Sequence, residues 1–67
     1  MSIQRKIGEE VARARRQSGM TQQGLARLAK TRQANISRLE RGIQNPSVEF
    51  LERVAHCLGR KIRIKLD

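Results

Sequence analysis

The stretch MTQQGLARLAKTRQANISRLERG, residues 20–42, decides the fold because it encodes two short helices joined by a tight turn. Thr21 is a good N-cap for the first helix, since its hydroxyl can accept a free backbone N–H group. The apolar residues after it recur at helical spacing and predict a buried stripe, formed by Leu25, Ala26, Leu28 and Ala29. Residues 30–32 are then expected to form a turn, and residues 33–41 a second helix that Gly42 stops.

The two sides of the helix expected over residues 33–41 differ in polarity. At about 100° per residue, Ile36 and Leu39 lie on one side. The other side is an arc of about 140° that carries Gln33, Ala34, Ser37, Arg38 and Arg41. In the major groove of DNA, Gln can bind adenine through two hydrogen bonds, Arg can bind guanine, and Ala can contact a thymine methyl group. The pattern predicts a helix that rests on a core and reads base edges.

Amphipathic helices are expected on both sides of this unit. Before it, residues 3–17 carry an apolar stripe formed by Ile3, Ile7, Val11 and Ala14. After it, a helix is expected between an N-cap at Ser47 and a stop at Gly59. This helix is predicted to be buried through Val48, Leu51, Val54, Ala55 and Leu58. The expected fold class is therefore all-α, a compact four-helix helix–turn–helix domain that spans residues 1–67.

The last residues alternate in polarity and predict one C-terminal β-strand over residues 60–66. Its apolar face is formed by Ile62, Ile64 and Leu66, and its other face is cationic. Because the sequence offers no second strand, this one is expected to pair with the same strand of another copy and close a homodimer. The alternative is a frayed basic tail. Phe50, the only aromatic residue, is expected either in the core or as an anchor of the dimer interface.

Composition narrows the classes of partner. The 67 residues carry 15 Lys and Arg against 6 Asp and Glu, a net charge of +9, which indicates an anionic partner. Some of these cations need not contact the anionic partner. Arg13 and Arg16 can either contact phosphates or solvate the surface, and Arg27 is expected to be solvated. No apolar run exceeds two residues, so no membrane span is expected. A membrane is not among the expected partners. With one cysteine, Cys57, and no signal-peptide pattern, the protein is expected to be cytoplasmic.

The sequence also argues against an enzyme or a metalloprotein. His56 and Cys57 are adjacent, and there is no other His or Cys to complete a metal site. The only Asp is Asp67, so a Ser/His/Asp arrangement lacks its members, and no glycine-rich phosphate loop is present. No catalytic residue, metal, cofactor or small-molecule ligand is therefore expected.

Residues 20–42 resemble the helix–turn–helix of the XRE family, the phage Cro and CI-repressor type. The most specific matches are Thr21-Gln22, Leu25-Ala26 and the run ISRLERG at residues 36–42. The resemblance continues through residues 45–47 and 51–55, so it covers nearly the whole chain. It implies a domain that binds an operator in double-stranded DNA.

Carried over by position, the resemblance assigns roles in DNA binding. Gln22 matches a residue that contacts a phosphate and braces the recognition helix. Gln33 and Ala34 match the main base-reading positions, and Arg38 matches a position that reaches bases or backbone. The resemblance and the polar arc together give a candidate DNA-binding set, which is Gln22, Arg32, Gln33, Ala34, Ser37, Arg38 and Arg41.

Other positions have structural roles by the same resemblance. Lys30 stands in place of the usual turn glycine, so a non-glycine residue must adopt a positive φ, at a cost of about 1–2 kcal/mol. Arg32 stands where the family has a small N-cap residue; its cation can bind phosphate, and the cap is expected to move to Thr31. Arg15 and Glu40 match a pair that forms a structural ion pair between the first and third helices.

The minimal domain, the hinge at Pro46-Ser47 and the terminal strand resemble the HipB-like and HigA-like antitoxins of bacterial type II toxin–antitoxin systems. This resemblance implies a dimer that represses its own operon at a palindromic operator and neutralises a toxin protein. Alternatives are a stand-alone phage-type repressor without a toxin and a helix–turn–helix module that only docks a protein. A basic amphipathic membrane binder and an RNA-binding protein are weaker alternatives, the latter because stacking aromatic residues are scarce.

Overall fold

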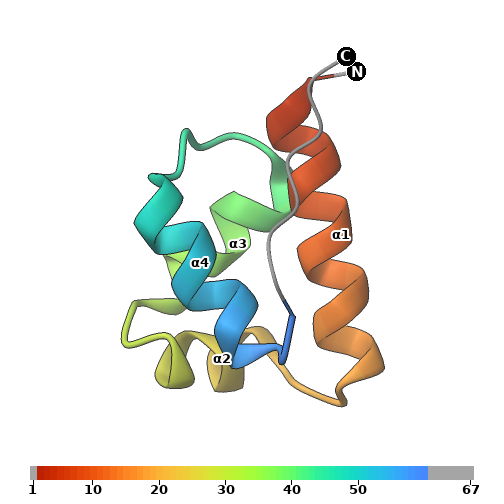
Figure 1. The fold of residues 1–67 in the computed structure, drawn as a ribbon, viewed down its shortest axis with the longest axis vertical. Coiled ribbons are helices and arrows are strands. Elements are labelled where there is room, and N and C mark those ends of the chain that lie inside the picture. Colours follow the sequence, from red (N-terminus) through yellow and green to blue (C-terminus); the bar gives the residue numbers. More distant parts are fainter. Residues whose placement is uncertain (1, 61–67) are drawn as a thin grey trace.

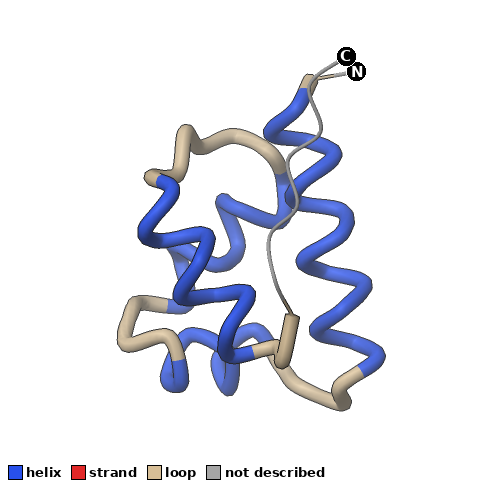
Figure 2. The backbone as a smooth tube through the Cα atoms, viewed as in Figure 1, coloured by secondary structure: helices blue, strands red, loops and turns tan. Residues whose placement is uncertain are grey.

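The computed structural model describes residues 2–60, which form four helices joined by short connections (Figure 1, Figure 2). They are α1 (Ile3–Gln17), α2 (Gln22–Leu28), α3 (Gln33–Arg41) and α4 (Val48–Cys57). This confirms the expected compact four-helix arrangement, including both ends of α1 and α3. The strand expected over residues 60–66 lies outside the described residues apart from Arg60. Among the helices of residues 2–60, none is long and apolar enough to cross a membrane.

Three of these helices begin with a hydroxyl cap. The side chains of Ser2, Thr21 and Ser47 each accept the backbone N–H three residues later, at 3.1, 2.9 and 3.0 Å. The exception is α3, whose N-cap residue Arg32 makes no side-chain cap bond. The expectation that Thr31 caps α3 is wrong, because its hydroxyl instead accepts the side-chain amide of Asn35 at 2.8 Å.

The helices pack around α3. Both α1 and α2 pack against it, and α4 packs against α2 (Figure 1). The core is a cluster of buried aliphatic side chains formed by Leu25, Ala26, Ala29, Ile36, Leu39 and Val54. Phe50 is half-buried and packs against this cluster, and the guanidinium of Arg53 lies 5.6 Å from the centroid of its ring. Phe50 thus contacts the core, and its expected role in a dimer interface stays a prediction.

Two apolar residues that were predicted to be buried are exposed: Leu28 is 56% exposed and Val48 59%. The predictions of burial at these two positions are therefore wrong. Ile3, the first residue of the apolar stripe of α1, is also exposed, at 75%. Each of the three stands at the first or last position of its helix. The other predicted apolar residues of α4 are buried or half-buried.

The backbone of α1 lies directly against the C-terminal end of α3. A Cβ atom placed on Gly8 would lie 2.4 Å from the carbonyl oxygen of Leu39 and 2.6 Å from that of Glu40. Gly42 ends α3 in the left-handed conformation, with φ of 73°, and a Cβ atom there would lie 2.6 Å from Cα of Arg5. Glycine at both positions therefore permits the close approach that fixes α3 against α1.

Candidate nucleic-acid interface

One side of α3 rests on the core and the other faces solvent. The inner side is formed by Ile36 and Leu39, which are fully buried. The outer side gathers the candidate DNA-binding residues of this helix: Arg32, Gln33, Ala34, Arg38 and Arg41 are exposed, and Ser37 is half-buried. The five helical residues share one arc of α3, and Arg32, its N-cap residue, lines one depression together with Gln33. We call these six residues the outer face of α3.

The turn between α2 and α3 closes with the Schellman pattern of hydrogen bonds. The backbone N–H of Lys30 donates to the carbonyl of Arg27 at 3.2 Å, and that of Thr31 to the carbonyl of Ala26 at 2.9 Å. Lys30 has φ of 56°, which confirms the positive φ expected at this non-glycine position. Ala29, the C-cap residue of α2 beside this turn, is buried in the core cluster.

Arg15 of α1 and Glu40 of α3 form a buried ion pair with two contacts. Nε of Arg15 lies 2.6 Å from Oε2 of Glu40, and Nη2 lies 3.1 Å from Oε1. Only 11% and 5% of the two side chains are exposed. Nη1 of Arg15 also donates to the carbonyl of Met20 at 2.8 Å. The hydrogen bond to Glu40 raises the pKa of Arg15 above its ordinary value, against the opposing effect of burial, so this guanidinium stays charged.

Gln22 joins α2 to this ion pair. Its Nε2 donates to Oε1 of Glu40 at 2.9 Å, and because a carboxylate only accepts, the contact settles which end of the amide faces Glu40. One carboxylate thus ties α1, α2 and α3 together, and Arg15 neutralises its charge. This contact can perform the bracing role that the resemblance implies for Gln22. A phosphate contact through its second N–H stays a prediction.

A further contact on α3 involves Asn35, which lies outside the predicted DNA-binding set. The side chain of Asn35 donates to Oγ1 of Thr31 at 2.8 Å and accepts from Nη1 of Arg38 at 3.3 Å. The available signal was the spacing of Asn35 and Arg38, which are three apart on α3 and so are neighbours on the helix surface. Thr31 lies in the turn just before the N-cap residue Arg32.

A shallow, open depression lies where α2 meets the start of α3. It is lined by Gln23, Ala26, Arg27, Thr31, Arg32 and Gln33. Arg27 is exposed, as expected for a solvated residue, but it lines the same depression as Arg32 and Gln33. It therefore adds a cation beside the outer face of α3.

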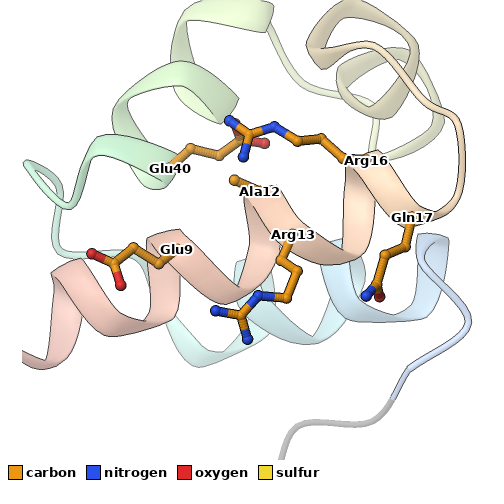
Figure 3. Close-up of a pocket in the computed structure, with 6 residues that line it drawn as sticks. All are labelled: Glu9, Ala12, Arg13, Arg16, Gln17 and Glu40. Carbon is orange, nitrogen blue, oxygen red and sulfur yellow. The ribbon is translucent and has the colours of Figure 1, made fainter.

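A second depression follows α1 (Figure 3) and is lined by Glu9, Ala12, Arg13, Arg16, Gln17 and Glu40. The side chain of Arg16 points toward the end of α3 that carries Glu40, whereas the side chains of Arg13 and Gln17 point away from Glu40 (Figure 3). Arg13 and Arg16 are exposed, and neither forms an ion pair with any residue between 2 and 60. A phosphate contact or a solvated surface remain the two predictions for them.

Metal-binding chemistry has no candidate cluster in the part of the chain that the structure describes. Within residues 2–60, no three His, Cys, Asp or Glu side chains gather in a way that could hold a metal ion. Cys57 is a half-buried free thiol that packs against the core, and its neighbour His56 is exposed.

Sequence comparisons find relatives along most of the chain. Residues 11–65 match the helix-turn-helix family HTH_3. The chain is 37% identical over 59 residues to the uncharacterized HTH-type transcriptional regulator y4dJ of Sinorhizobium fredii, covering 88% of this chain and 77% of that protein. It is 34% identical over 62 residues to the HTH-type transcriptional regulator SinR of Bacillus subtilis, covering 91% of this chain. The matched region is 56% of SinR, so this chain spans just over half the length of that relative.

Solved structures share the fold. The clp gene regulator ClgR of Corynebacterium glutamicum superposes with a TM-score of 0.90 at 29% identity, covering 92% of this chain and 80% of that one. The restriction-modification controller protein C.AhdI of Aeromonas hydrophila gives 0.84 at 26% identity, covering 87% and 84%. The family match over residues 11–65 and the relatives above 30% identity show that this chain belongs to the XRE-type helix-turn-helix family.

Proposed function

We propose that this protein is a sequence-specific transcriptional repressor that binds double-stranded DNA through α3. The observation that carries the proposal is the outer face of α3, where exposed Gln33, Arg38 and Arg41 are backed by the buried Ile36 and Leu39. A side chain can read a base edge only when its helix is held rigidly, and the contacts around the buried ion pair hold this one. Relatives named as transcriptional regulators support the same function.

The outer face of α3 and its surroundings offer both kinds of DNA contact. Gln33 can bind adenine, Ala34 can contact a thymine methyl group, and Arg38 can bind guanine. Arg27 and Arg32 supply cations for the phosphate backbone, and α3 begins without a side-chain cap, at the positive end of its dipole. Phosphate contacts position the protein and base contacts give specificity. A protein bound in this way blocks RNA polymerase by occupying the operator.

We expect Gln33→Ala to weaken binding to the preferred duplex by about 5- to 150-fold, which is about 1–3 kcal/mol for one two-bond base contact. The preferred duplex is first selected from a random pool by the full-length chain. Fluorescence anisotropy then gives the dissociation constants for the selected duplex and for an unselected duplex of equal length. Binding to the unselected duplex should hardly change, because the phosphate contacts remain.

The matched control is Gln17→Ala at the last residue of α1, where the exposed glutamine side chain makes one hydrogen bond, accepting from Nη2 of Arg60 at 2.9 Å. It should bind both duplexes as the parent does. An equal loss on both duplexes for Gln33→Ala would contradict base reading by α3. Random-pool selection that enriches no sequence would contradict the proposed function itself.

The proposed repressor is a homodimer closed by the C-terminal strand, with the two α3 helices about 34 Å apart on a palindrome. The alternating residues 60–66 support this proposal. We expect Ile64→Lys in the full chain to weaken the dimer by about 10- to 150-fold, because it removes about 1.5–3 kcal/mol of apolar burial. Sedimentation equilibrium measures the change, with Arg63→Ala on the opposite strand face as the control. A dimer unchanged by Ile64→Lys would exclude the ribbon.

The finer proposal is that the repressor is the antitoxin of a type II toxin–antitoxin system. It is supported by the helix–turn–helix together with the alternating segment over residues 60–66. The protein encoded by the adjacent reading frame provides the test. If that protein arrests growth when expressed alone, binds this chain, and is neutralised by it, the antitoxin role holds. If it does none of these, the chain is a stand-alone repressor.

A further inference from the structure

Asn35 links the turn before α3 to an arginine on the outer face of the helix. Its Nδ2 donates to Oγ1 of Thr31 at 2.8 Å, and its Oδ1 accepts from Nη1 of Arg38 at 3.3 Å. Arginine has donors only, so the amide oxygen must face Arg38, which turns the amide nitrogen toward the Thr31 hydroxyl. Thr31 and Asn35 are half-buried and Arg38 is exposed. The contacts therefore run from the fixed turn to a solvent-facing guanidinium.

These contacts distinguish Arg38 from the other cations of the same face. Within residues 2–60, neither Arg32 nor Arg41 has a side-chain hydrogen bond or an ion pair. A free arginine samples many rotamers and loses that freedom when it binds a base. Asn35 is uncharged, so it restricts Arg38 without neutralising it. Only one N–H of Arg38 is used, and the remaining donors can reach a guanine edge.

We propose that Asn35 is a positioning residue for specificity, which holds the Arg38 guanidinium so that it reads one base pair of each half-site. This inference rests on the proposed function, because it requires α3 to bind DNA. Asn35 makes no DNA contact of its own in this scheme. Its removal leaves the charge of Arg38 in place, so the attraction to phosphates is kept while discrimination at one base pair is lost.

A double-mutant cycle in the full-length chain tests the proposal. The parent, Asn35→Ala, Arg38→Ala and the double variant are titrated with the selected duplex and with duplexes changed at one base pair at a time. Arg38→Ala identifies the base pair that depends on Arg38. We expect Asn35→Ala to reduce the preference at that base pair by about three- to tenfold, in the range for residues of one hydrogen-bond network, and to change nothing further once Arg38 is absent.

Two matched variants control the cycle. Thr31→Val removes the hydroxyl that holds Asn35 and should reduce the preference at the same base pair by a smaller factor. It also carries the test if thermal unfolding shows that Asn35→Ala does not fold. Asn35→Ala combined with Arg41→Ala should give additive effects, because Asn35 makes no hydrogen bond to Arg41.

Three results would overturn the inference. In the first, Asn35→Ala reduces the base-pair preference equally whether or not Arg38 is present. In the second, Asn35→Ala weakens binding evenly at all base pairs. In the third, the preference is unchanged in both Asn35→Ala and Thr31→Val. In each of these the parent still prefers its selected duplex, so the proposed function survives. A parent chain with no preference at any base pair would instead overturn the proposed function and this inference together.

Discussion

Replacing Arg15 with alanine is expected to lower the free energy of unfolding by about 3–5 kcal/mol, because it leaves the Glu40 carboxylate buried without its counter-charge. The Glu40 side chain is only 5% exposed, so water cannot take over the lost contacts without a rearrangement of α1 and α3. A domain of this length has about 3–10 kcal/mol of total stability. The variant should therefore be largely unfolded, or close to it, at 37 °C.

Urea denaturation followed by circular dichroism measures this change. Arg13→Ala is the matched control, since Arg13 is exposed on the same helix and forms no ion pair within residues 2–60; it should shift stability by no more than about 0.5 kcal/mol. Because the pKa of Arg15 is raised in the folded chain, the contribution of its charge is lost only in strongly alkaline solution. Exposed ion pairs contribute up to about 1 kcal/mol to the free energy of unfolding. If Arg15→Ala lowers that free energy by less than this, a buried structural role for the pair would be contradicted.

Replacing Gly8 with alanine is expected to destabilise the fold by about 1–3 kcal/mol through overpacking, although the same change in an ordinary helix stabilises it by about 1 kcal/mol. The new Cβ atom would lie 2.4 Å and 2.6 Å from the carbonyl oxygens of Leu39 and Glu40. These are backbone atoms at the end of α3, so they cannot rotate away. Relief requires that α1 and α3 move apart, which would also strain the contacts between Arg15 and Glu40.

The control for this substitution is Glu10→Ala, which introduces alanine at an exposed position of α1 and should change stability by no more than about 0.5 kcal/mol. The midpoint of thermal unfolding shows the difference, because 1 kcal/mol corresponds to about 4–8 °C in a domain of this size. A Gly8→Ala variant as stable as the parent would mean that α1 and α3 are not in the close contact described here.

Helix positions were predictable from the sequence because their signals are local. Hydroxyl caps at Thr21 and Ser47 and the apolar spacing of residues 3–17 and 33–41 depend only on nearby residues. How far each apolar stripe is covered depends on the neighbouring helix, which the spacing does not describe. Leu28 was therefore predicted to be buried and is 56% exposed.

The polar face of α3 was also predictable, since helical geometry alone places Ile36 opposite the arc that carries Gln33 and Arg38. The close contact at Gly8 was not, because it depends on where another helix passes. Asn35 was missed for a related reason. Its contacts depend on the side-chain rotamers that link Thr31 to Arg38, and spacing shows only which residues are neighbours.

We propose above all that the outer face of α3 is the surface that contacts DNA. Amide chemical-shift changes in the isotope-labelled full-length chain, titrated with the selected duplex, test it most directly. We expect the largest changes from Arg32 to Arg38 and at the start of α2, with small changes over α4. Changes centred on the solvent-facing side of α1, with α3 unaffected, would contradict it.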